Sequence, residues 1–259
     1  MAVSASDIEI YLTGAESNGG AQTDPDAALG NYRSSTLKND ETAIDDGDGI
    51  SDSDATITVD STTDFSSSGY ITIEDEVISY TGKTGVSFTG CTRGALDTTA
   101  AAHDDNTPVL ELNLESLYDH VTGTEASSGD TEYRCFCVKN AHATDTAYNV
   151  KVYIAETTGN AEDAISFAVE MPAEGSETDG AAQTIANEST EPTVNSGRVS
   201  AWSTATSRAT GVGTDQDYHD AHLDAGELAY VWVRRVVSAS ASAANNERYG
   251  IAVAFDTAA

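Results

Sequence analysis

Short stretches in which apolar and polar residues alternate recur along most of the chain. Successive side chains of a strand point to opposite faces of its sheet, so this period of two predicts β-strands. Only residues 114–121 show a spacing that suits a helix, of about two turns. The expected strands occupy residues 7–12, 56–59, 70–73, 76–80, 86–88, 109–112, 131–140, 148–155, 164–170, 198–202, 227–237 and 248–255.

Turn-forming segments between the strands divide the chain into two regions. Between 46 and 112 the strands are short and separated by runs such as Ser-Ser-Gly and Thr-Gly-Lys-Thr-Gly, which predicts a small β module. The longer strands elsewhere, with no alternation of strand and helix, predict a β-sandwich of Ig-like or jelly-roll-like type. The expected all-β fold is a sandwich built from residues 1–45 and 113–259. The module 46–112 is inserted in one of its loops, where insertions are well tolerated.

The charge of the chain adds an expectation about its environment. Asp and Glu number 43 against 12 Lys and Arg, which gives a formal net charge of −31. The Debye length falls from about 8–10 Å at ordinary salt to about 3 Å at 1 M, so molar salt screens the repulsion between surface carboxylates. Carboxylates also keep a protein soluble in concentrated salt. This composition predicts a folded protein of a halophile; the recurring apolar strands disfavour the alternative, a disordered acidic chain.

The same charge argues against several classes of partner. Nucleic-acid phosphates require Lys and Arg, so nucleic-acid binding is not expected. No apolar run approaches the roughly 20 residues that span a bilayer, and the first residues lack the basic and apolar regions of a secretory signal. We therefore expect synthesis in the cytoplasm and no membrane partner. The scarce cations Arg134, Arg234 and Arg235 are expected to pair with carboxylates inside the molecule or across an interface.

The three cysteines are interpreted as buried thiols. Cys135 and Cys137 lie two residues apart on an expected strand, so their side chains share a face. At about 3.3 Å per residue their Cα atoms are about 6.5–7 Å apart, which is too far for an unstrained disulfide. A metal site would need further Cys or His ligands at a recognisable spacing, and none accompany these cysteines or Cys91.

Two segments carry residue types that bind cations. The acidic loop 46–54 offers hard oxygen ligands of the kind that Ca²⁺ prefers, although it lacks the EF-hand spacing. Ca²⁺ or another cation is its expected ligand, and the candidate residues are Asp46, Asp48, Asp52 and Asp54. In the second segment, 215–224, His219 and His222 lie among four Asp, a set that suits zinc or manganese. A solvated loop is the favoured interpretation there, because no pattern places the two histidines on one face.

Motifs that carry catalysis are not found in the sequence. Gly82-Lys83-Thr84 resembles the end of a phosphate-binding loop, but Val77 stands where the motif needs glycine and a strand follows where it needs a helix. We interpret it as a hairpin turn. The sequence contains no Gly-x-Ser-x-Gly, His-Glu-x-x-His or Gly-x-Gly-x-x-Gly. The chain is therefore not expected to be an enzyme. A single glycosylation sequon begins at Asn187, a number expected by chance.

Two parts of the chain resemble structural proteins of tailed phages. Residues 65–82, and above all Gly-Cys-Thr-Arg-Gly-Ala-Leu-Asp-Thr-Thr-Ala-Ala-Ala-His at 90–103, resemble a β module found in several such proteins. The larger region is similar to uncharacterised phage virion proteins at residues 129–140, 148–154, 183–190 and 229–235. Together the resemblances cover most of residues 55–259 and imply a structural role without known catalytic residues. Combined with the acidic composition, they point to a tailed virus of a haloarchaeon.

The expected function is that of a non-enzymatic virion protein, made in the host cytoplasm. A decoration or turret-type protein on the capsid surface is favoured, with the major capsid protein and copies of the chain itself, as a trimer or pentamer, as partners. A tail or baseplate component is one alternative. The other is a module that binds glycans or an S-layer on the host surface, for which Tyr218 and Tyr249 are candidate exposed aromatics.

Overall fold

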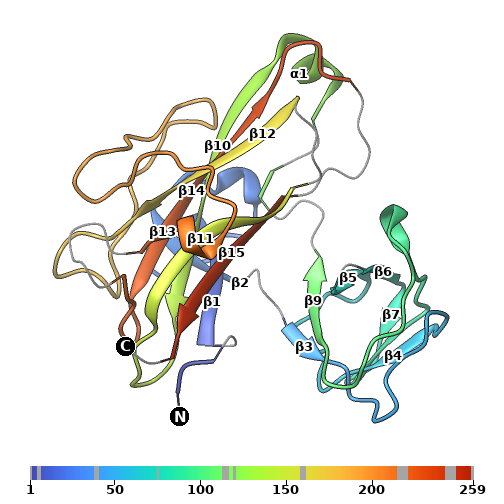
Figure 1. The fold of residues 1–259 in the computed structure, drawn as a ribbon. Coiled ribbons are helices and arrows are strands. Elements are labelled where there is room, and N and C mark those ends of the chain that lie inside the picture. The colour runs from blue at the N-terminus through green and yellow to red at the C-terminus, as the bar shows by residue number, and fades with distance from the viewer. Residues whose placement is uncertain are drawn as a thin grey trace. The chain divides into compact units, whose positions relative to one another are not determined.

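A computed structural model describes residues 2–4, 7–37, 41–74, 76–112, 117–118, 121–157, 162–214, 221–242 and 249–257 and shows an all-β protein (Figure 1). The chain forms two compact units, a larger one of Met1–Lys38 and Leu117–Ala259 and a smaller one of Asn39–Ser116. The sequence pattern places residues 41–43 in the larger unit. In the structure they form β3 (Glu41–Ala43), which pairs with β9 (Pro108–Leu112) and belongs to the smaller unit.

The larger unit contains two antiparallel sheets. One has the order β12-β14-β10-β1-β2, and the other has the order β13-β11-β15. The strands of the first sheet are β1 (Ile8–Ala15), β2 (Tyr32–Leu37), β10 (Asp130–Asn140), β12 (Asp163–Glu170) and β14 (Leu228–Val237). Those of the second are β11 (Tyr148–Thr157), β13 (Val212–Gly213) and β15 (Tyr249–Asp256).

The main core of the larger unit lies between its two sheets. Alternate residues of the central strands β10 and β14, such as Phe136 and Val231, pack with Val152 of β11. This burial follows from the period-two pattern, which puts every second side chain on one face. The remaining members come mainly from β11, β12 and β14: Val150, Ile154, Ile165, Phe167, Val169, Ala229 and Val233.

The opposite face of the five-stranded sheet is also buried, under irregular segments rather than a further sheet. Tyr133, Cys135, Cys137, Tyr230 and Trp232 form a second core with apolar residues of the segments around 29 and 182–202. Sequence alternation predicts one buried set on each of β10 and β14. The structure buries both sets, because loops cover the face that would otherwise meet solvent.

The smaller unit has two antiparallel sheets around one core. Their orders are β3-β9-β5-β6 and β4-β8-β7. The core includes Ile57, Ile71, Ile78, Tyr80 and Phe88. The remaining strands are β4 (Thr56–Thr58), β5 (Gly69–Ile73), β6 (Glu76–Tyr80), β7 (Gly82–Lys83) and β8 (Ser87–Thr89).

Four local predictions differ from the structure. The helix expected at 114–121 lies partly outside the described residues, and the described helix is α1 (Gly123–Ser128), which a capping box of Thr122 and Glu125 begins. Residues 198–202 form no strand, and Val199 alone among them makes isolated bridges, to Glu170 and Ser196. β2 is not expected from the sequence, because its run Tyr-Arg-Ser-Ser-Thr-Leu lacks apolar alternation. Gly82 and Lys83 form β7, and the turn follows them at 84–87.

Candidate functional site

Residues 93–103 form a buried polar network around Glu76. Its carboxylate accepts hydrogen bonds from Arg93 Nε (2.9 Å) and Nη2 (2.7 Å), from the backbone amides of Gly94 (2.8 Å) and Ala101 (3.1 Å), and from His103 Nε2 (2.8 Å). The side chain of Glu76 is fully buried. Burial by itself raises the pKa of this carboxyl, but the hydrogen bonds from Arg93, His103 and the two amides outweigh it and lower the pKa to about 2.

His103 joins this network to the rest of the smaller unit. Its Nδ1 contacts Glu74 Oε2 at 2.8 Å, so the ring lies between a buried and an exposed carboxylate. Its backbone pairs with Ile50 in an antiparallel bridge, and Arg93 Nη1 donates to the carbonyl oxygen of Ser51. The network therefore attaches the acidic loop to β6.

The structure does not bring the four candidate aspartates of that loop together. Asp46 Oδ1 accepts from the amide of Asp48 (3.3 Å), and Asp54 Oδ2 accepts from the amide of Ser51 (2.7 Å), which lowers the pKa of Asp54. No three of Asp46, Asp48, Asp52 and Asp54, all of which are described, place carboxylate oxygens within 4.8 Å of one another. The carboxylates of Asp46 and Asp54 therefore cap turns of the loop, and cation binding at the loop stays a prediction.

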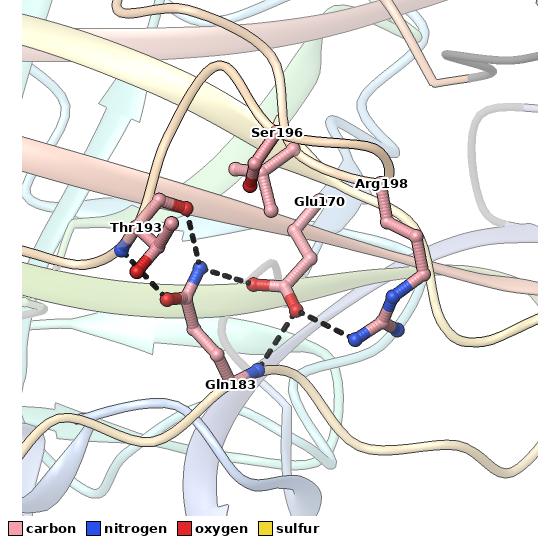
Figure 2. Close-up of a pocket in the computed structure, with 6 residues that line it drawn as sticks. Glu170, Gln183, Thr193, Ser196 and Arg198 are labelled. Atoms are coloured by element: carbon pink, nitrogen blue, oxygen red, sulfur yellow. Dashed lines mark hydrogen bonds and ion pairs between the residues drawn. The ribbon is translucent and has the colours of Figure 1, made fainter.

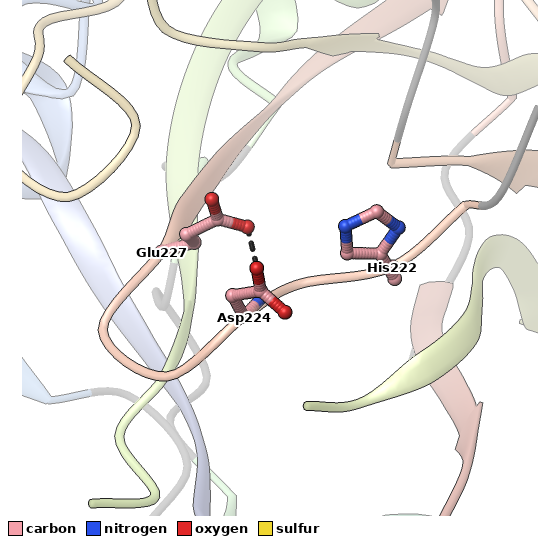
Figure 3. A group of neighbouring side chains, drawn as sticks. All are labelled: His222, Asp224 and Glu227. Atoms are coloured by element: carbon pink, nitrogen blue, oxygen red, sulfur yellow. Dashed lines mark hydrogen bonds between the residues drawn. The ribbon is translucent and has the colours of Figure 1, made fainter. Parts of the chain in front are cut away.

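A second group of acidic residues lies before β14 (Figure 3). His222, Asp224 and Glu227 offer ligand atoms within 4.8 Å of one another. Glu227 Oε2 accepts from the amide of Asp224 (2.8 Å), and Asp224 Oδ1 accepts from Thr146 Oγ1 (2.5 Å). Burial and the carboxylates of Asp224 and Glu177 raise the pKa of Glu227. Of the two histidines considered from the sequence, His222 is placed here and His219 lies outside the described residues.

A pocket of about 200 Å³ opens beside the loops that cover the five-stranded sheet (Figure 2). At its base Glu170 is fully buried and accepts from the amide (2.8 Å) and Nε2 (3.1 Å) of Gln183, and from Trp232 Nε1 (2.7 Å). Arg198 Nη2 approaches the same carboxylate at 3.7 Å. These contacts attach the segment 183–198 to β12, so the polar groups of the pocket have a structural role. The remaining lining residues are Thr193, Ser196 and Val199.

Buried ion pairs extend one end of the core between the sheets. Glu132 of β10 lies opposite Arg235 of β14 and accepts from its Nε at 2.8 Å. Arg134, which is fully buried, donates from Nη2 to Glu188 (2.6 Å) and lies 3.3 Å from Asp26. The expectation that these two arginines pair with carboxylates inside the molecule is confirmed.

Aromatic rings complete the surroundings of the arginines. The ring of Tyr118 lies 4.7 Å from Arg235 Cζ and 5.6 Å from Arg134 Cζ, and its hydroxyl donates to the carbonyl of Val233 (2.7 Å). Arg234 differs from the prediction, because its Nε donates to Ser166 Oγ (2.9 Å) and its guanidinium covers the ring of Trp202. Tyr118 lies in the stretch 114–121 for which a helix is expected, and no motif there singles it out for contact with the arginines.

The three cysteines are buried in the cores, and His142 holds a turn. All three cysteines are free and buried, as expected, and burial raises the pKa of Cys91 to about 11 and that of Cys135 and Cys137 further. His142 Nδ1 accepts from the amides of Thr144 (3.3 Å) and Asp145 (2.9 Å), which closes a turn. The thiols are therefore poor nucleophiles in the folded protein.

The two remaining candidate positions are also placed in part. Asn187 is exposed, and its Oδ1 accepts from the amide of Ser189 (3.1 Å). Tyr218 lies outside the described residues, whereas Tyr249 is half-buried and donates to the carbonyl of Asp163 (2.7 Å). Tyr249 is thus a packed residue rather than a protruding aromatic.

Comparisons with known proteins were made for the whole chain. No family model matches it, and no curated protein or solved structure is significantly similar to it. None of the helices in the described ranges is long and apolar enough to span a bilayer. The geometry of each polar cluster is therefore the guide to its role. The best-defined cluster, around Glu76, holds a loop in place.

Proposed function

We propose that the chain is a non-enzymatic structural protein of the virion of a halophilic tailed virus, positioned on the capsid surface as a decoration or turret-type protein. In this proposal the larger unit is a β-sandwich of Ig-like or jelly-roll-like type, and the smaller unit is the inserted module. The supporting sequence feature is the resemblance of residues 90–103 to a module of phage structural proteins.

The observation that carries the proposal is the set of contacts that residues 90–103 make in the smaller unit. Arg93, Gly94, Ala101 and His103 all bind one buried carboxylate, Glu76. Gly94 also has a φ of 60°, a left-handed conformation that favours glycine. The distinctive residues of the run therefore stabilise its own loop against β6. A loop held in this way suits a module that contributes stability to an assembly and does not catalyse a reaction.

The distribution of charge supports a halophilic setting. Arg93 and Arg235 are buried against the buried carboxylates of Glu76 and Glu132, so these two cations do not offset the acidic groups at the surface. With 43 acidic residues in the chain, the surface is strongly anionic and suited to molar salt. The proposed partners are copies of the chain, as a trimer or pentamer, and the major capsid protein. Nucleic acid and membrane are not proposed as partners.

Copy number in purified particles tests the proposal. Particles from the halophilic host would be purified on a density gradient in molar salt, and peptides from both units quantified by mass spectrometry against isotope-labelled standards. A capsid-surface component is expected at tens to hundreds of copies per particle, on the order of the number of symmetry-related positions on the shell. About three to twelve copies would instead indicate a tail or baseplate component.

Two further outcomes distinguish the host-surface alternative from a protein outside the virion altogether. Absence from washed particles, together with binding of the purified chain to host cells or isolated S-layer, would establish the host-surface alternative. Absence from particles without such binding would overturn the virion proposal altogether. Peptides from both units serve as an internal control, since cleavage of one unit would lower the count for that unit alone.

A further inference from the structure

The two sheets of the larger unit have unequal widths. The first has five strands and the second three. Both β11 and β13 contact β12, the edge strand of the first sheet, so the three-stranded sheet covers that side. No residue of β2, at the other edge, belongs to the core between the sheets. The smaller sheet therefore ends at β15, before the larger sheet does.

One edge of β15 is open at Gly250–Phe255 in the part of the chain that the structure describes. Within the described residues it pairs with β11 alone, and Gly250–Phe255 have no backbone hydrogen bond to any other segment. The other long edges of this unit are bridged. Val199 and Ser203 pair with β12, and Gly20 pairs with Ser34 of β2. Strand edges of this length normally carry a charge, a proline or a covering segment, because unpaired amides and carbonyls recruit further strands.

The apolar side chains of β15 are also incompletely buried. Ile251, Val253 and Phe255 pack against the core, yet each remains half-buried. Ile10 of β1, on the facing sheet, is also only partly buried against this core. A further strand beside β15 would complete the burial of these apolar groups.

The charge of the chain and the lack of charge on β15 indicate which partner pairs with this edge. The chain carries −31, but residues 249–255, Tyr-Gly-Ile-Ala-Val-Ala-Phe, contain no charged side chain. A long uncharged edge is a place where two such acidic molecules can approach without opposing carboxylates. An antiparallel pair formed by the same strand from two copies is self-complementary about a two-fold axis. Gly250, Ala252 and Ala254, on the face away from the core, are small and do not obstruct it.

We propose that β15 pairs antiparallel with β15 of a second copy of this chain, which joins the two three-stranded sheets into one continuous sheet. The backbone edges supply the hydrogen bonds, and the half-buried apolar groups of both copies extend the core across the two-fold axis. The inference rests on the larger unit alone, so it does not depend on the proposed function. A two-fold contact of this kind is compatible with rings that meet edge to edge on a shell.

The test is the mass of the full chain in solution, measured by sedimentation and light scattering in about 2 M NaCl, where the Debye length is about 3 Å or less. The wild type is expected to show a concentration-dependent dimer of twice 27.0 kDa. Ala252→Glu puts two carboxylates side by side at the two-fold axis and is expected to weaken the dimer about two- to fivefold, because like charges opposite each other on paired strands lie close enough that molar salt screens only part of their repulsion. Ala173→Glu, the same change at an exposed loop position, should leave the dimer intact.

A second measurement keeps the inference testable if Ala252→Glu fails to fold. Amide hydrogen exchange of the wild type should show protection of alternate β15 amides that increases with protein concentration, as the outer edge becomes paired. A wild type that stays monomeric at high concentration overturns the inference. So does any oligomer that Ala252→Glu leaves intact while it remains folded, or one that forms without added protection in β15.

Discussion

Glu76→Gln is the most informative single change in the smaller unit. It preserves the shape of the side chain but removes the charge that five donors share. Arg93 would then keep a buried guanidinium without its carboxylate, since its side chain is 6% exposed. Removing one partner of such a pair costs about 3–5 kcal/mol.

The pKa of Glu76 gives a second measure of the same interaction. A carboxyl with a pKa of 4.5 unfolded and about 2 folded contributes about 3 kcal/mol when ionised, at about 1.4 kcal/mol per pH unit. Because the folded pKa is the lower one, this stability is present above pH 4.5 and is lost as the pH falls towards about 2. Both routes predict a loss of about 3 kcal/mol for Glu76→Gln at pH 7.

Glu74→Gln is the matched control. Glu74 contacts the other nitrogen of His103 at the same distance, but its side chain is 64% exposed. Surface ion pairs are worth about 0–1 kcal/mol, so this variant should lose less than about 1 kcal/mol. Both variants remove one carboxylate from His103, but only Glu76→Gln also removes the buried partner of Arg93 and of the Gly94 and Ala101 amides, so the difference between them measures that buried network.

The stability of the smaller unit is measured by urea unfolding in molar salt. Hydrogen exchange of peptides from β6 and β8 monitors the transition. Fluorescence of Trp202 and Trp232 reads the larger unit and should not change. The difference between wild type and Glu76→Gln should shrink as the pH is lowered from about 5 towards 2. Equal losses for the two variants, or a loss below about 1 kcal/mol for Glu76→Gln, would refute the reasoning.

Three further outcomes are expected. Lowering NaCl from molar to about 0.1 M should abolish cooperative folding through unscreened repulsion, and an unchanged melting temperature by circular dichroism would contradict the halophilic interpretation. Arg235→Glu should destabilise the larger unit by about 3 kcal/mol or more, since it puts a second carboxylate beside the buried Glu132; a stable variant in urea unfolding would disprove that role. A thiol reagent should label Cys91, Cys135 and Cys137 only on unfolding, and rapid labelling of the native protein would show that these thiols are accessible.

Sequence reasoning reached the element types of most of the chain because the signals are local. The alternation in residues 131–140 and 227–237 predicts β10 and β14, which the structure places side by side. The scarcity of cations correctly assigns Arg134 and Arg235 to internal ion pairs. It fails for Arg234, whose position on the other face of β14 brings it to Trp202 instead of a carboxylate.

By itself, the sequence determined that the protein is all-β, strongly acidic and free of the familiar catalytic motifs, since alternation and composition are properties of short windows. Only the tertiary structure decided what depends on distant segments meeting. It placed β3 with β9, buried one face of β10 against the second sheet and the other face under loops from around residues 29 and 182–202, and gathered Arg93 and His103 at the carboxylate of Glu76. Within the described residues it also left one edge of β15 unpaired at Gly250–Phe255, because strand order within a sheet is set by long-range pairing and not by the pattern of any one strand.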